Sequence, residues 1–191
     1  MTTTKKLAIA VVALSLALVC VIGGTLAFLV ATSNTVTNTF TYGEITLKLW
    51  EEEKTNETGM NFTNVVPGDV LEKDPVVTVV KGSEACYVYV LIDNQLGTAA
   101  TYNIDNTWTK VGESGTKVLY RYASVVDATE EAEDLAVFNK LKFESNLVKA
   151  EVDSLADKNV VISAYAHQSD NTDQATADNA AIAWADVTAS N

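Results

Sequence analysis

The chain has 191 residues, enough for one ordinary domain and a short targeting segment. Its 25 acidic and 13 basic residues give a formal net charge of -12. A chain this acidic repels nucleic-acid phosphates and anionic lipid headgroups. Nucleic-acid binding is therefore excluded, and we expect membrane contact only through the apolar N-terminal segment.

The N-terminus has the order of a secretory signal. A polar start with two lysines precedes an apolar run, and a Gly-Gly pair breaks that run. Thr25 and Ala27 are the small residues expected at the -3 and -1 positions of a cut before Phe28. These residues predict a signal peptide over 1–27 and processing by a signal peptidase.

A retained membrane anchor is the alternative interpretation of the same segment. No charged residue occurs between Lys6 and Glu44, and residues 7–31 are long enough to cross a bilayer. The basic N-terminus would stay inside, so both interpretations export the rest of the chain. They differ in the first residue of the recovered protein, which is Phe28 after cleavage and Met1 with the anchor retained.

The mature chain begins with a segment that we expect to be weakly held. Residues 32–43 are rich in Thr and Asn, with only scattered apolar side chains. This composition predicts a weak or flexible first strand within residues 28–43. The remainder, residues 44–191, is predicted to form one β-sandwich domain.

Strand patterns dominate residues 44–191. Residues 44–50 and 159–168 alternate apolar and polar side chains, as half-buried strands do. Residues 76–80 are β-branched, and residues 85–93 are apolar on both faces, which indicates a central strand. Residues predicted to form much of the core are Ile45, Leu47, Leu49, Val88, Val90, Val160 and Ile162.

Turns and helices complete the prediction. Pro67-Gly68 indicates a turn, and residues 103–126 indicate a hairpin across Gly112 to Gly115. Residues 128–143 carry acidic side chains at their start and are predicted to be helical. Residues 173–187 predict a short amphipathic helix that presents Ala177, Ala181 and Trp184. Many short strands and few helices favour an all-β, jelly-roll-like sandwich with one or two short helices, preceded by the hydrophobic signal helix.

No catalytic constellation is evident in the sequence. The single histidine, His167, is expected to be a partly exposed strand residue, and the zincin motif H-E-x-x-H is absent. Cys86 is expected to be a small buried hydrophobe, and Cys20 lies within the apolar run. We therefore predict no catalytic residue, no metal site and no cofactor.

Clusters of acidic side chains are predicted to be solvated surface. They comprise Glu51 to Glu53 and the group Glu130, Glu131, Glu133 and Asp134. Weak calcium binding is conceivable there, because carboxylate oxygens suit hard cations, but the spacing is not that of an EF-hand. The Asp-rich stretch before residue 174 is explained in part by helix capping.

Three blocks resemble the TasA/camelysin family of exported bacterial proteins. The first is "GGTLAFLVATSNTVTNTFTYGEITLKLWE", with Gly23, Gly24, Thr25, Ala27, Asn38, Phe40, Gly43, Ile45 and Leu47 as the matching residues. The second is "NVVPGDVLEKDPVVTVVKGSEACYVYVLI", which matches at Pro67, Gly68, Asp69, Lys73 and Asp74. The C-terminal block "ISAYAHQSDN…AAIAWADV" is similar to shorter clostridial-type members.

The resemblance implies export with cleavage by a SipW-type signal peptidase, a jelly-roll sandwich and assembly into biofilm matrix fibres. In such fibres the mature N-terminal segment adds as a strand to the neighbouring subunit. By position this donor is Phe28 to Tyr42 here, with Val36, Phe40 and Tyr42 as its apolar side chains. The implied partners are further copies or related matrix proteins, and the location is the matrix or cell surface of a bacterium. Camelysin-type members carry a metallopeptidase label, which the absent zincin motif puts in doubt.

Overall fold

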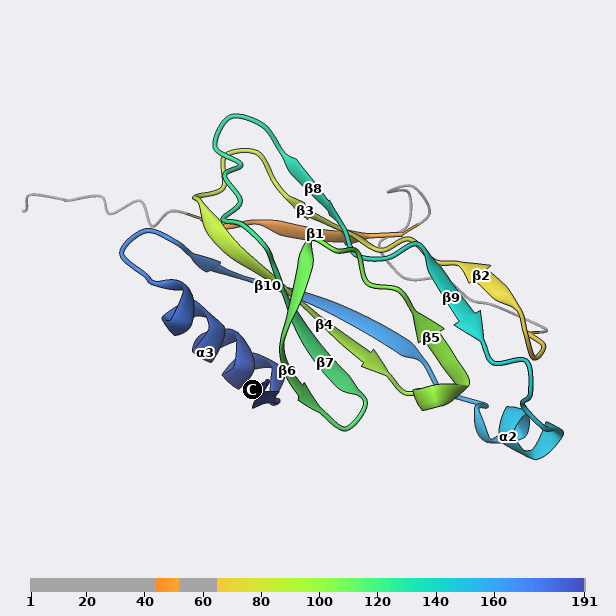
Figure 1. Cartoon of the computed structure of the whole chain (residues 1–191). Coiled ribbons are helices and arrows are strands. Elements are labelled where there is room, and N and C mark those ends of the chain that lie inside the picture. The colour runs from red at the N-terminus through yellow and green to blue at the C-terminus, as the bar shows by residue number, and fades with distance from the viewer. Residues whose placement is uncertain (1–43, 52–64, 191) are drawn as a thin grey trace, which may run out of the picture. The chain divides into compact units, whose positions relative to one another are not determined.

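The computed structural model describes residues 44–51 and 65–190, and strands dominate this part of the chain (Figure 1). Two α-helices, α2 (Lys149–Ser154) and α3 (Gln174–Ala185), and the 3-10 turn η1 (Gly97–Ala99) lie among the described strands. The strands are β1 (Leu47–Trp50), β2 (Val70–Glu72), β3 (Val76–Val79), β4 (Cys86–Asn94), β5 (Ala100–Tyr102), β6 (Trp108–Ser114), β7 (Lys117–Tyr122), β8 (Glu133–Ala136), β9 (Lys140–Phe143), β10 (Val160–Gln168) and β11 (Thr188–Ala189). The predicted all-β sandwich is confirmed.

The largest sheet has five strands in the order β10-β4-β7-β6-β11, and all of its pairs are antiparallel. β4 lies inside this sheet, as its apolar sequence predicts, and both of its faces carry buried side chains. β6 and β7 form the predicted hairpin, in which Gly115 occupies the turn with a φ of 61°. Among the described strands, β10 and β11 are therefore the two edges of this sheet.

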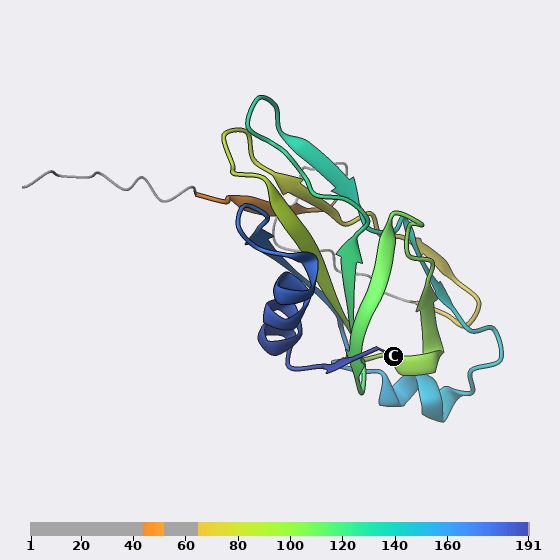
Figure 2. The same ribbon diagram turned by 60° about the vertical axis from the view of Figure 1, so that its left-hand side comes forward.

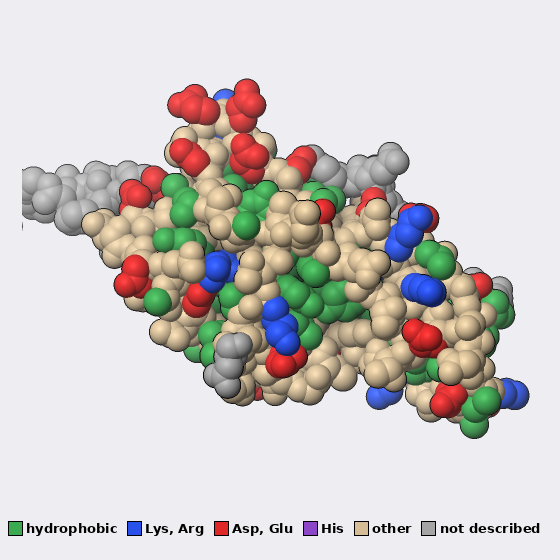
Figure 3. Space-filling model, viewed as in Figure 1, with side chains coloured by type: hydrophobic (Ala, Val, Ile, Leu, Met, Phe, Trp, Pro, Cys, Tyr) green, Lys and Arg blue, Asp and Glu red, His purple; other side chains and the backbone are tan. Residues whose placement is uncertain are grey.

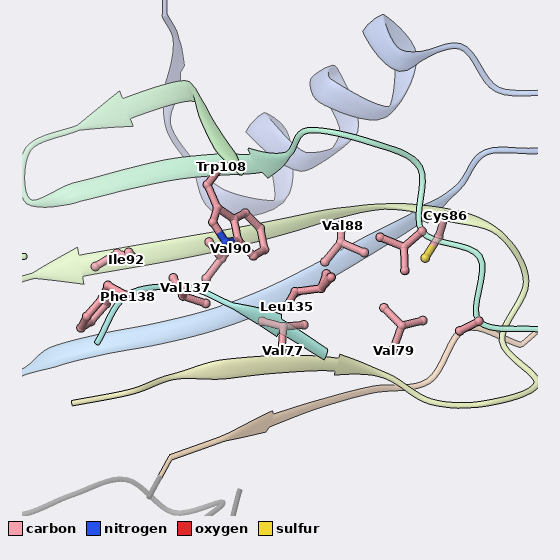
Figure 4. Packing of buried hydrophobic residues seen from close by; sticks show 12 residues of the cluster. Val77, Val79, Cys86, Val88, Val90, Ile92, Trp108, Leu135, Val137 and Phe138 are labelled. Atoms are coloured by element: carbon pink, nitrogen blue, oxygen red, sulfur yellow. The ribbon is translucent and has the colours of Figure 1, made fainter. Parts of the chain in front are cut away.

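One face of this sheet packs on a second layer that contains the order β1-β3-β8. Val77 and Val79 of β3 meet Val88 and Val90 of β4 in the main core (Figure 4). The predicted core residues of β1 and β10 pack against this cluster and are partly buried. The alternation in the sequence therefore identified the interior face of each strand correctly.

The second layer bends between two three-stranded parts. In the chain, β2 precedes β3 and β9 follows β8. β9 pairs with β2 on one side and with β5 on the other, in the order β2-β9-β5. At the bend the Lys73 amide donates to the Asn139 carbonyl (3.3 Å), and the Val137 amide donates to the Pro75 carbonyl (3.0 Å). These two bonds continue the pairing where the strands are interrupted. The Pro67-Gly68 turn that leads into β2 was predicted, and Gly68 has a φ of 91°.

The other face of the five-stranded sheet is covered by α3 (Figures 1 and 2). Asp173 caps this helix by accepting a hydrogen bond from the Thr176 amide (2.7 Å). Ala177, Ala181 and Ala185 form the buried stripe, so the predicted helix and two of its three predicted inner residues are confirmed. Trp184 differs from the prediction, because it is 41% exposed and stacks on Tyr165 at 5.1 Å between ring centroids.

The helix predicted over residues 128–143 is wrong, because this segment forms β8 and β9. Leu135 and Val137 alternate with exposed residues at β8, and Leu141 and Phe143 do so in β9, with the exposed Asn139 and Lys140 between the two pairs. Joined in one window, Leu135, Phe138 and Leu141 show a spacing of three that imitates a helix. Pairing with β3, β2 and β5, which are distant in sequence, decides the structure.

Candidate functional site

His167 lies on the face of β10 that α3 covers, and it is partly exposed as predicted. Its Nδ1 lies 3.0 Å from the Gln168 carbonyl oxygen, and its ring centroid is 6.5 Å from that of Tyr165. Among residues 44–51 and 65–190, no three His, Cys, Asp or Glu side chains come together as a metal site. The described surroundings of His167 are therefore aromatic and backbone groups.

Cys86 is fully buried in the main core. Burial disfavours the thiolate and raises the pKa of this thiol to about 11. The thiol is consequently protonated at neutral pH and is screened from reagents by the core. The prediction of a small buried hydrophobe is confirmed.

The predicted acidic surface is confirmed for one cluster and wrong for part of the other. Glu130, Glu131 and Glu133 are exposed in and beside the loop that joins β7 to β8, where Figure 3 shows acidic side chains together at the surface. Glu51 is instead buried, and its side chain forms an ion pair with Lys73, whereas Glu52 and Glu53 lie outside the described residues. The partner lies 22 residues away, so no local pattern indicated this pair.

A second polar group fastens α3 to the sheet. The Tyr89 hydroxyl donates to Asp178 Oδ1 (2.8 Å), and Arg121 donates to Asp178 Oδ2 (2.6 Å). Burial is the largest cause that raises the pKa of Tyr89, followed by its hydrogen bond to Asp178. The group links β4, β7 and α3, and we interpret it as a structural clamp.

The strands β1 and β10 form the feature most relevant to assembly, because each is the last strand of its sheet in the described part of the chain. They also lie next to each other, one in each layer of the sandwich. This pair of neighbouring edges is called the β1–β10 edge below. A sheet edge presents unpaired backbone donors and acceptors to any strand that arrives there.

The alternation of hydrogen bonds between β10 and β4 shows which residues of β10 direct their backbone groups outward. The Ser169 amide donates to the Ala85 carbonyl (2.9 Å), and the Gln95 amide donates to the Asn159 carbonyl (3.0 Å). Because antiparallel pairs alternate, the odd residues of β10 bond to β4. The even residues Val160, Ile162, Ala164, Ala166 and Gln168 direct their backbone N–H and C=O groups away from β4.

The same reasoning applies to β1. The Val80 amide donates to the Thr46 carbonyl (2.9 Å), so the even residues of β1 bond to β3. The odd residues therefore turn their backbone groups outward, while the side chains of Ile45, Leu47 and Leu49 pack toward the core. Apart from the exposed Gln168, the residues with outward backbone groups on both strands thus carry apolar, only partly buried side chains that face the interior.

This arrangement can accept a strand. An added strand would find backbone partners on an edge and apolar side chains beneath its inward face. β10 offers nine residues, which is longer than a typical strand of about five or six residues. The sequence identified the interior faces of β1 and β10 but gave no sign that the two strands are edge neighbours.

The predicted N-terminal site residues all lie outside the described residues. They are the cleavage residues Thr25, Ala27 and Phe28 and the donor residues Val36, Phe40 and Tyr42. The described chain begins at Glu44, directly after the predicted donor segment and immediately before β1. Within the described residues, no helix has the length and apolar character needed to span a membrane.

Comparison with known protein families gave one match. Residues 2–83 match the family model described as camelysin metallo-endopeptidase. The match covers the N-terminal segment, β1, β2 and β3. Comparison with curated proteins gave no significant match, and comparison with solved structures gave none either.

Proposed function

We propose that this protein, whose residues 2–83 match the camelysin family model, is an exported structural protein of the TasA/camelysin family without catalytic activity. It would build or decorate a fibre of the bacterial cell surface or biofilm matrix. The family is one of exported bacterial proteins. The observation that carries the proposal is the β1–β10 edge. Both of its strands lack a neighbour on their outer side among the described residues, and both carry apolar side chains toward the core.

The proposed assembly step is donor-strand exchange between copies. Residues 28–43 of one copy would add as a strand at the β1–β10 edge of the next. Val36, Phe40 and Tyr42 have even spacing, so in a strand their side chains point to one face. That face would meet the half-buried side chains of β1 and β10, and backbone hydrogen bonds would supply the affinity.

Deletion of residues 28–42, with residues 1–27 kept for export, is expected to give a folded monomer that does not polymerise. The acceptor edge would be intact in this variant, but the donor would be missing. Electron microscopy and light scattering would measure fibre formation, and circular dichroism would check the fold. A synthetic peptide of residues 28–42 is expected to bind the truncated protein with a stoichiometry of one.

A scrambled peptide of the same composition is the matched control for that experiment. It retains the Thr- and Asn-rich character but places Val36, Phe40 and Tyr42 out of phase. Equal binding of both peptides would contradict a register set by the edge. Fibres formed by the truncated protein would contradict donor exchange altogether, and the edge would then be a passive end of the sandwich.

A membrane-anchored adhesin is the alternative within the same structural class, with residues 7–31 retained as an anchor. Its sandwich would face outward in the same way, but its N-terminal segment would be tethered and could not reach a neighbouring copy freely. The acidic charge of the chain suits an exposed surface domain in either case.

The family description also names a metallo-endopeptidase, which is the candidate from a different class. For this chain we expect no stoichiometric zinc after exposure to the metal and removal of excess, measured by elemental analysis. Zinc bound at one equivalent, and lost in His167→Ala, would contradict the non-catalytic proposal. His167→Gln, which keeps a polar side chain at the same strand position, is the control for a change in folding.

A further inference from the structure

A third apolar cluster surrounds a cavity of about 320 Å³ between the β2-β9-β5 sheet and α2. Leu71, Leu141 and Phe143 line it from the sheet, and Val152 and Leu155 line it from α2 and the residue after it. Twelve of the fifteen described lining residues are apolar. Cavities of this size and composition hold small ligands in many proteins.

This cluster is incompletely buried. Only three of its members are buried, namely Ala100, Leu141 and Phe143. Leu71 and Leu155 are half-buried, and Val66 on the lining is 55% exposed. Figure 3 shows hydrophobic side chains at the surface over the end of the molecule that carries α2. An apolar occupant would therefore remove further apolar surface from water.

The charges on the lining all have one sign. Lys73 and Lys158 are the charged residues among the described lining residues, which include no Asp or Glu. Lys73 is neutralised by its buried ion pair with Glu51. Lys158 is exposed, and its ammonium group has no ion-pair partner in the described part of the chain. In a protein of net charge -12, an apolar cavity with a free cation is selective for an anionic head group.

We propose that this cavity binds a medium-chain carboxylate, with its alkyl chain among the aliphatic side chains and its carboxylate at Lys158. A volume of about 320 Å³ equals about ten water molecules in the liquid, which suits a chain of roughly eight carbons. The inference is independent of fibre assembly, because the cavity and the β1–β10 edge are formed by different residues. Val160 is the one described residue that belongs to both.

Octanoate binding to the full chain, recovered in the form that cells produce, tests the proposal. Backbone amide NMR is expected to show saturable, single-site shifts at Val152, Leu155 and Asn159. Lys158→Gln is expected to weaken octanoate binding about two- to fivefold, the range of a partly exposed ion pair. Val152→Phe, which fills the cavity, is expected to abolish binding.

Two comparisons separate the charge from the cavity. Lys149→Gln is the matched control, because Lys149 lies on α2, is ion-paired with Asp153 and does not line the cavity. Octan-1-ol should bind the wild-type protein more weakly than octanoate, and octylammonium more weakly still. Equal binding of octanoate and octan-1-ol, unaffected by Lys158→Gln, would overturn the carboxylate assignment.

The cavity itself has a separate failure criterion. Unchanged octanoate binding in a folded Val152→Phe variant would overturn the site. If the amide spectrum shows that this variant is unfolded, Val66→Phe tests the same point at an exposed position of the lining. Absence of saturable octanoate binding to the wild-type protein would overturn the proposal as a whole.

Discussion

Replacing Ala164 with proline is expected to abolish fibre assembly while the sandwich stays folded. Ala164 is an even residue of β10, so its N–H points away from β4 and forms no hydrogen bond to another strand in the described part of the chain. Proline would remove a donor that only an incoming strand could use, and its ring would obstruct that strand. Proline is tolerated on edge strands in this orientation, so we expect a loss of about 1 kcal/mol or less in the free energy of unfolding.

The neighbouring Ser163 provides the matched control, because its backbone N–H points toward β4, whereas that of Ala164 points away from it. Ser163 lies opposite Leu91 in a bonded pair with β4. Ser163→Pro would remove that bond and leave a carbonyl of the central strand without its donor. We expect a loss of about 2 to 4 kcal/mol, measured by denaturant unfolding.

The two proline variants thus separate assembly from stability. Electron microscopy should show no fibres from Ala164→Pro, although its unfolding transition stays close to that of the wild type. Fibres formed at the wild-type rate would show that the outer side of β10 is not the acceptor. Leu47→Pro would then test β1, whose odd residues turn their backbone groups outward. Should Ala164→Pro fail to fold, Ala166→Pro tests the same edge one pair further along β10.

The sequence allowed prediction of the donor segment of the proposed assembly contact but not of its acceptor edge. The donor residues Val36, Phe40 and Tyr42 follow from their position after the signal segment and from the family resemblance. The acceptor depends on which strands lie at the edges of their sheets. Alternation defines the interior face of a strand but carries no information on its lateral neighbours, so residues 44–50 and 159–168 could not be recognised as adjacent edges.

The error over residues 128–143 has a related cause. Hydrophobic spacing within a window is a local signal, whereas β8 and β9 are defined by partners far away in sequence. The acidic start of this segment added a helical preference that tertiary pairing overrode. The strand over residues 159–168 was predicted correctly, because its apolar and polar side chains alternate without interruption and no local helix signal competes with this pattern.

Burial of Glu51 and Lys73 leads to the second large prediction, on stability. Their side chains are only 8% and 7% exposed, and they join the end of β1 to the bend of the second layer. Removing one member leaves the other charge buried without a partner. Lys73→Met is therefore expected to lower the free energy of unfolding by about 3 to 5 kcal/mol.

A surface pair of the same type is the control for that measurement. Lys140 and Glu72 are 54% and 76% exposed, with 3.5 Å between Nζ and Oε1. Lys140→Met is expected to cost about 1 kcal/mol or less, because solvent screens this pair. Both variants convert lysine to methionine beside β2, so the difference between them isolates the effect of burial.

The double variant Glu51→Leu/Lys73→Met distinguishes a buried pair from simple loss of packing. If the unpaired charge causes the destabilisation, removing both charges should recover most of it, and buried pairs replaced by apolar side chains are often as stable as the original. Glu51 Oε2 has no hydrogen-bond partner in the described structure, which strengthens this expectation, because the native pair already leaves one buried acceptor unsatisfied. Urea unfolding would measure Glu51→Leu, Lys73→Met and the double variant. A loss in the double variant equal to the sum of the two single losses would contradict coupling between Glu51 and Lys73. The bend would then depend on the aliphatic part of Lys73 and on its backbone bond to Asn139.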